Sequence, residues 1–266
     1  MRVFGNSDCQ RRMTGLVDEG LEGVFFIHGP CALGKRTFLE SLVARSHGGL
    51  SVASTVDGVR ALKSTVSIMP VEDDVHDVVV MDVDRMAAPA QDACLKLVEE
   101  PPPRGRIWLH AHDVGAVGPA LRSRLRNEFR WTTVSHDEML EFALSLGPVD
   151  EFSLSAAKGR PGLYATMRLD PRFSGLHDAL SSFMDGRRNL LTEPLPVLLS
   201  DLDADSPLRE PVGTILSCVA KSFLPRGLPL LALASKIVSN ASLNVELHWF
   251  TTMASISPLK AVLSVI

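Results

Sequence analysis

The segment "VFFIHGPCALGKRTFLE", Val24 to Glu40, places a strand-like run directly before two glycines, a lysine and a helical pattern. The glycines and the lysine, Gly29, Gly34 and Lys35, have the Gly-x4-Gly-Lys spacing of a phosphate-binding loop. Such a loop turns backbone N–H groups and the N-terminus of the next helix toward phosphate oxygens. The order of strand, loop and helix therefore predicts an α/β domain of the phosphate-loop type.

Two more continuous apolar runs, Asp77–Asp82 and Arg106–His112, follow in the first half of the chain. Strands that are apolar on both faces belong to parallel sheets covered by helices, and helical patterns alternate with these runs. We therefore expect a doubly wound parallel sheet. One of the intervening helices is expected in "APAQDACLKLVEE", where Pro89 suits a helix start.

The pattern changes after about Trp131. Ser135 and Glu138 form a capping box, and two short helices are expected around the Gly-Arg-Pro-Gly turn at 159–162. From about residue 171 the apolar residues recur only at helical spacing, with Trp249 and Phe250 near the end. We predict three domains: an α/β domain at 1–133, a small helical domain at 134–170 and an all-helical domain at 171–266.

Composition limits the possible classes of protein. The net charge of −4 argues against an isolated nucleic-acid-binding module, which is usually basic. The four cysteines are scattered without a C-x2-C pair, so we expect no zinc and no other metal centre. No run approaches the length of a membrane span, and the first residues lack the apolar core of a secretory signal. A soluble cytoplasmic protein is the expectation.

The loop departs from the pattern of a competent ATPase. Arg36 stands where a hydroxyl normally holds Mg²⁺, and Thr37 comes one residue too late. Asp82 ends a strand where such folds hold Mg²⁺, but Val83 follows it and cannot accept a proton from an attacking water. Two readings stay open at this point: a loop that still holds nucleotide, and a tight glycine turn kept for packing.

Four further stretches carry a family resemblance. They are "DVDRM" (82–86), "DACLKLVEEPP" (92–102), "VGPALRSRL" (117–125) and "AAKGRPGLYA" (156–165). In this order they resemble the AAA+ clamp loader subunits, in particular the delta-prime family of bacterial DNA polymerase III or its phage counterparts. The resemblance implies an AAA+ (P-loop) α/β domain with a parallel sheet, a small helical lid domain and an all-helical C-terminal collar domain for assembly.

The resemblance also implies roles for single residues. Arg124 would be an arginine finger that completes the ATP site of a neighbouring subunit, and Ser123 would help to set its loop. Nucleotide, ATP or ADP with or without Mg²⁺, would be held in the loop by five residues: Gly29, Gly34, Lys35, Thr37 and Asp82. Four positions depart from the family's catalytic pattern: Arg36, Val83, His112 and Gly162. Arg160 lies close to the last of these and is an open candidate to replace it.

These departures favour a subunit that assists hydrolysis next door and has weak or no ATPase activity of its own. The implied partners are other clamp loader subunits, the sliding clamp and primer–template DNA, within a replisome or a phage-infected cell. Two alternatives are kept: an ATP-hydrolysing motor subunit of the same assembly, and an AAA+ regulator or loader unrelated to clamps.

Overall fold

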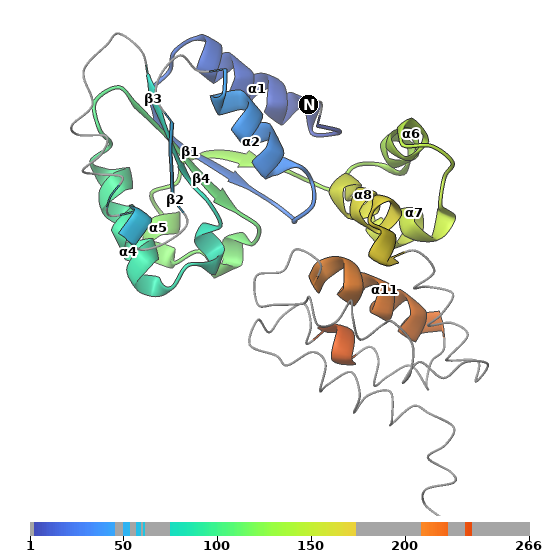
Figure 1. Cartoon of the computed structure of the whole chain (residues 1–266). Coiled ribbons are helices and arrows are strands. Elements are labelled where there is room, and N and C mark those ends of the chain that lie inside the picture. Colours follow the sequence, from blue (N-terminus) through green and yellow to red (C-terminus); the bar gives the residue numbers. More distant parts are fainter. Residues whose placement is uncertain are drawn as a thin grey trace, which may run out of the picture. The chain divides into compact units, whose positions relative to one another are not determined.

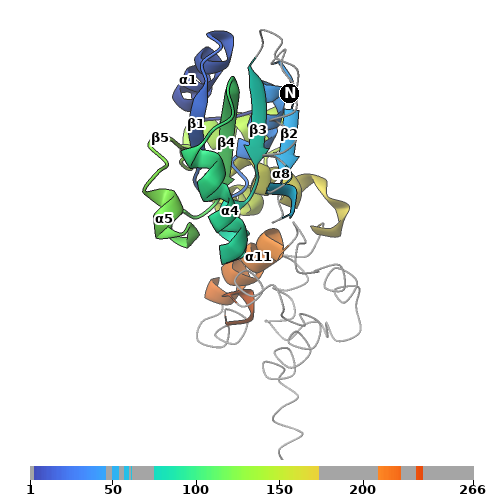
Figure 2. The ribbon, with the colours of Figure 1, turned by 90° about the vertical axis from the view of Figure 1, so that its left-hand side faces the viewer.

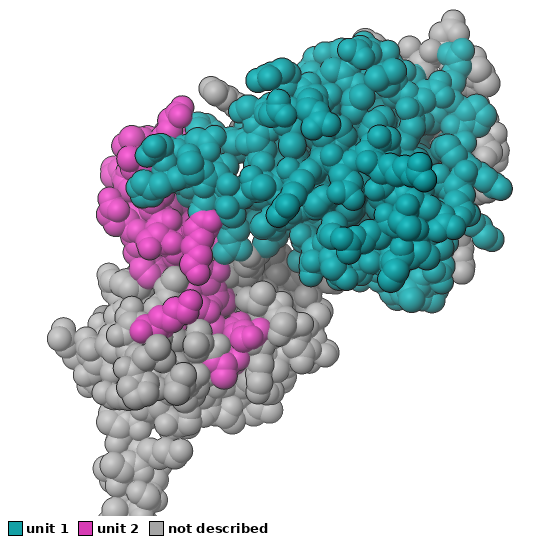
Figure 3. All heavy atoms as spheres, turned by 180° about the vertical axis from the view of Figure 1, so that it is seen from behind, with its two compact units in different colours: residues 1–139, 159–161 teal, residues 140–158, 162–266 magenta. Residues whose placement is uncertain are grey.

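The computed structural model describes residues 3–45, 50–53, 57–59, 61, 75–173, 209–222 and 232–235. The chain divides into two compact units, residues 1–139 with 159–161 and residues 140–158 with 162–266 (Figure 3). The predicted collar segments that contain Trp249 and Phe250 lie outside the described residues.

The first unit alternates helices and strands, as its sequence predicts (Figure 1). Its strands are β1 (Gly23–His28), β2 (Leu50–Ala53), β3 (His76–Val80), β4 (Gly105–Ala111) and β5 (Asn127–Arg130). Its longer helices are α1 (Ser7–Asp18), α2 (Lys35–Val43) and α4 (Ala88–Glu99), and the short helical segments are η1 (Val83–Arg85), η2 (Val114–Ala116) and α5 (Pro119–Arg122).

The five strands form one sheet in the order β2-β3-β4-β1-β5, which Figure 2 shows from the side. All four neighbouring pairs are parallel, so the predicted parallel sheet is confirmed. The carboxyl ends of the strands therefore meet at one edge of the sheet. Any side chain that follows β1, β3 or β4 directly is placed at this edge.

Helices cover both faces of the sheet (Figure 1). On one face, Met13 of α1 and Leu39 of α2 pack with strand residues such as Ile27 and Trp108. On the other face, Leu97 of α4 and Leu121 of α5 pack with Val78 and Leu109 among others. Every residue of β3 and β4 is buried, because both faces of these strands are covered.

Two charged residues lie inside this apolar structure. Arg106 of β4 is 1% exposed and Asp77 of β3 is fully buried. The guanidinium donates Nε–H to Asp77 Oδ1 at 2.7 Å and Nη2–H to Oδ2 at 3.0 Å. Trp108 Nε1 donates to the same carboxylate at 2.8 Å, and Arg106 Nη1 donates to the carbonyl of Leu16 at the end of α1. The pair therefore joins two strands and a helix.

The second unit contains α7 (Glu151–Ala157), α8 (Pro161–Leu169), α11 (Arg209–Ser222) and the short η3 (Pro171–Phe173). Of α8, only the first residue, Pro161, belongs to the first unit. Helix α6 (His136–Ser145) runs from the first unit into the second. The predicted capping box is confirmed, because Ser135 and Glu138 exchange backbone-to-side-chain hydrogen bonds of 2.9 and 3.2 Å. The separation of a lid from a collar stays a prediction.

Among the described residues, no helix is long and apolar enough to cross a bilayer.

The buried ion pair gives a first prediction. Asp77→Asn should lower the free energy of unfolding by about 3–5 kcal/mol, because it leaves the Arg106 charge buried without its partner. Urea unfolding followed by circular dichroism measures this change. The double variant Asp77→Leu/Arg106→Met is the matched control, because it removes both charges and should recover most of the loss. A single variant as stable as the wild-type chain would contradict the assignment.

Candidate functional site at the carboxyl edge of the sheet

The loop between β1 and α2 has the backbone conformation that its glycines permit. Gly29 has φ 134°, and a Cβ there would lie 2.1 Å from the carbonyl oxygen of Trp131. Gly34 has φ 85° and is the N-cap of α2. Gly29 is thus required by packing against the segment after β5, whether or not a phosphate is bound. This agrees with the packing interpretation of the glycine turn, one of the two left open by the sequence.

Lys35 is buried and fully hydrogen-bonded within the chain. Its Nζ donates to the carbonyls of Gly29 at 2.6 Å and Pro30 at 2.7 Å, and it lies 3.4 Å from His112 Nδ1. Burial lowers the pKa of Lys35 to about 8, and the nearby Asp84 and Asp82 oppose that shift. An ammonium group has three protons, and all three have acceptors here. Contact with a phosphate would require at least one of these bonds to break.

Arg36 does not point its charge into the loop. Its Nε donates to Glu40 Oε1 at 2.8 Å, one helical turn along α2, where both side chains are exposed. Thr37 is half-buried at the next position of the helix. The position that would hold a metal-binding hydroxyl therefore carries a cation paired elsewhere. Mg²⁺ with nucleotide fits this set of residues poorly.

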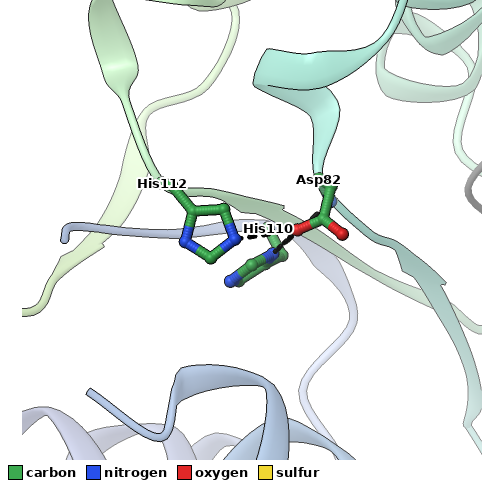
Figure 4. Close-up of side chains that lie close together, drawn as sticks. All are labelled: Asp82, His110 and His112. Atoms are coloured by element: carbon green, nitrogen blue, oxygen red, sulfur yellow. Dashed lines mark hydrogen bonds and ion pairs between the residues drawn. The ribbon is translucent and has the colours of Figure 1, made fainter. Parts of the chain in front are cut away.

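Asp82 lies between two histidines from the neighbouring strand end (Figure 4). Its Oδ1 is 3.1 Å from His110 Nδ1 and 3.1 Å from His112 Nε2. The hydrogen bonds to His110 and then to His112 hold the pKa of Asp82 well below its usual range, so the carboxylate is ionised at neutral pH. Because the Lys35 ammonium can only donate to His112 Nδ1, the neutral ring of His112 carries its proton on Nε2, toward Asp82.

After Asp82 the chain does not continue as a strand but turns into η1 at Val83. Asp84 Oδ2 therefore accepts backbone N–H bonds from His112 at 3.1 Å and Asp113 at 3.0 Å. Val83 is fully buried in the core. No carboxylate can occupy its place without unpacking that core.

Arg124 belongs to a different cluster, after α5. Its Nε donates to Glu99 Oε1 at 2.5 Å, and its Nη1 donates to the carbonyl of Ala120 at 2.8 Å. Ser123 Oγ donates to the same carbonyl and lies 3.4 Å from Arg124 Nη1. The arginine side chain is 41% exposed, so it is oriented by the end of α4 and still accessible.

Arg160 is the sequence candidate to replace the arginine that is missing at Gly162, and it belongs to the first unit. Its Nη1 lies 3.9 Å from Sγ of Cys31 in the loop. A guanidinium is thus present beside the loop, although Gly162 stands at the family's usual arginine position. Of the five predicted nucleotide-binding residues, Lys35 and Asp82 lie at the same strand-end cluster, and both contact His112.

Sequence reasoning missed His110 and the interaction of both histidines with Asp82. The signal was present as "HAH", residues 110–112, since alternate residues at a strand end face the same side. It also missed Glu99 as the partner of Arg124. That pairing depends on how the end of α4 packs against α5, which spacing in the sequence does not give.

Together the parallel sheet, the strand–loop–helix unit and the aspartate after β3 define an α/β fold of the P-loop type. Residues 37–129, about a third of the chain, match a family described as "DNA polymerase III, delta subunit". This segment is therefore similar to the delta subunit family of DNA polymerase III. No curated protein sequence matches the chain.

Two solved structures are similar to the chain, and the first of them supports this fold. A DNA polymerase III gamma subunit-related protein from Thermotoga maritima is 17% identical and covers 94% of this chain and 98% of its own, with a TM-score of 0.52. The RuvB Holliday junction branch migration motor from Thermotoga maritima is 15% identical, with 82% of each chain covered and a TM-score of 0.47. At these identities the likeness concerns the fold.

The packing role of Gly29 is testable. Gly29→Ala should destabilise the chain by at least about 1–3 kcal/mol, because the backbone strain at positive φ adds to the clash with the Trp131 carbonyl. Gly15→Ala in α1 is the control, because a Cβ added at Gly15 would have no neighbouring atom within 4 Å. Higher helix propensity should make this control neutral or more stable by about 1 kcal/mol. Thermal unfolding of both variants without nucleotide gives the comparison, and an unaffected Gly29→Ala chain would argue against the packing role.

Proposed function

We propose that this chain is a delta-prime-type subunit of a DNA polymerase sliding-clamp loader, one that supports ATP hydrolysis in a neighbouring subunit. The observation that carries the proposal is the family match over residues 37–129, which includes α4 and most of the first unit. The match supports a role in replication with other clamp loader components. The delta-prime type, the sliding clamp and primer–template DNA as partners, and the hetero-oligomer belong to the proposal.

The geometry of the loop supports weak or absent hydrolysis by the chain itself. Val83 is buried in the core at the position that would activate water, and Arg36 is paired with Glu40. Lys35 is held by two loop carbonyls and His112. Hydrolysis would need a carboxylate in the place of Val83, a hydroxyl in the place of Arg36 and a free Lys35 ammonium. None of these three groups is available, which supports a subunit that hydrolyses ATP weakly or not at all. Nucleotide binding through Gly29, Gly34, Lys35, Thr37 and Asp82 stays a prediction.

The geometry of Arg124 supports the role of an arginine finger. A finger must reach a neighbour's γ-phosphate, where a guanidinium neutralises the charge that develops during transfer. Arg124 is accessible, and the Glu99 carboxylate and the Ala120 carbonyl restrain two of its nitrogens. An oriented side chain loses less freedom when it docks, which is an advantage for a group that acts in another subunit.

The central experiment compares two arginines of the same loop. Arg124→Ala should lower ATP hydrolysis by the assembled loader by about 10³-fold or more, because a finger supplied in trans accelerates phosphoryl transfer by about 10³–10⁵. Arg126→Ala, which removes an exposed arginine two residues further on, is the matched control and should leave hydrolysis unchanged. Size-exclusion chromatography of the co-expressed complex checks that both variants assemble. Full activity of the Arg124→Ala complex would overturn the finger assignment.

Lys35→Ala tests the status of the chain's own loop. In the assembled complex this variant should reduce hydrolysis much less than Arg124→Ala does, because the loop's ammonium is committed to internal hydrogen bonds. Steady-state ATPase rates of the two variant complexes give the ranking. The reverse ranking, or brisk hydrolysis by the isolated wild-type chain, would favour the motor-subunit alternative.

A further inference from the structure

We propose that Asp82, His110 and His112 bind one divalent transition-metal ion of the zinc type. Because the ion would use the carboxylate of Asp82, it would take the place of a nucleotide's Mg²⁺ at this residue. The three residues lie in the first unit, at the ends of β3 and β4 (Figure 4). The inference does not depend on the proposed function, and Arg124 plays no part in it.

The distances between the donor atoms suit such an ion. One carboxylate oxygen of Asp82 lies 3.1 Å from a nitrogen of each ring, and the candidate ligand atoms all lie within 4.8 Å of one another. Zinc binds imidazole nitrogen and carboxylate oxygen at about 2.0–2.2 Å, which puts tetrahedral ligands about 3.3–3.5 Å apart. The two oxygen–nitrogen separations therefore need to change by only a few tenths of an ångström to hold the ion, and the nitrogens of the two rings lie within 4.8 Å of each other.

The kinds of donor select the class of metal. Imidazole nitrogens favour zinc, copper, nickel and iron, whereas magnesium and calcium prefer an all-oxygen shell. Two histidines and one carboxylate also leave coordination positions open, which water or another small oxygen ligand can fill. Asp82 and His112 are 31% and 23% exposed, so an ion can approach from their side, while His110 forms the buried base of the site.

A pair of simple hydrogen bonds to Asp82 would give similar distances, and a metal titration separates the two arrangements. The backbone N–H of Asp82 donates to His110 Nδ1 at 3.4 Å, so the ring nitrogen that the ion would use already faces the Asp82 segment. Nε2 of the same ring is buried and, among the described residues, has no hydrogen-bond partner, so Nδ1 is the nitrogen of His110 that can reach the ion.

Lys35 links the metal site to the phosphate-type loop. With His112 Nε2 bound to the ion, the proton of the neutral ring moves to Nδ1, which faces the Lys35 ammonium. Two donors cannot share a hydrogen bond, so Lys35 must turn away when the ion binds. The chain can therefore hold either the ion or the hydrogen bond between Lys35 and His112, but not both at the same time.

The experiment titrates the metal-free full-length chain with Zn²⁺ by isothermal calorimetry, and with Co²⁺ followed by visible absorption. We expect one ion per chain and Co²⁺ bands of a four- or five-coordinate site, both insensitive to a large excess of Mg²⁺. His112→Gln and Asp82→Asn should each weaken binding by at least about 100-fold, because even outer-shell partners of ligands are worth about 10–100-fold. His136→Gln, at an exposed histidine of α6, is the matched control and should bind as the wild-type chain does.

A second variant keeps the proposal testable if a ligand substitution impairs folding. Lys35→Met retains all three ligands and should bind Zn²⁺ about fivefold or more tightly, the factor that corresponds to one hydrogen bond. The proposal is overturned if the wild-type chain binds no stoichiometric Zn²⁺, if His112→Gln and Asp82→Asn bind like the control, or if Mg²⁺ displaces Co²⁺ readily. Unchanged or weaker binding by folded Lys35→Met would remove the link to the loop.

Discussion

The buried pair of Asp77 and Arg106 fixes the register on which the functional edge depends. These residues lie opposite each other in β3 and β4, and the bidentate contact forms in this alignment. A one-residue slip of parallel strands would turn every side chain of a strand to the other face and leave both charges buried alone. The pairing ends at Val80 and Leu109, and just beyond it Asp82 contacts His110 and His112.

The register of β1 completes the edge. His28 is paired with Ala111 of β4, so the loop that begins at Gly29 emerges next to the two histidines. Lys35 then reaches His112 across that short gap, while Gly29 fits against the carbonyl of Trp131. Three strand ends thus supply a loop, a carboxylate and two imidazoles within one cluster. Local sequence sets the chemistry of each part, and the parallel ladder brings the parts together.

The sequence predicted the strands β1, β3 and β4, the helices α2 and α4 and the capping box of α6, because each has a strong local pattern. It did not predict β2 and β5, because each strand has only four residues. In β5 only Phe129 is buried, so this strand has no apolar pattern to recognise. The position of Asp84 could not be predicted, and the "HAH" spacing indicated His110 without giving its partner. Asp84 depends on the turn at Val83, and His110 depends on a register set by a charged pair in the core.

The contacts within the loop explain how its glycines and lysine can persist without hydrolysis. Gly29 is held by packing, and Lys35 satisfies two loop carbonyls and an imidazole nitrogen that would otherwise lose hydrogen bonds on burial. Val83 lies in the core, and the Asp82 carboxylate contacts the two histidines. Arg124 is anchored through Glu99 at the end of α4, by hydrogen bonds that involve none of these residues. On the proposed function, such a chain needs no hydrolysis of its own, because the arginine that it offers to a neighbouring subunit is held by a separate set of contacts.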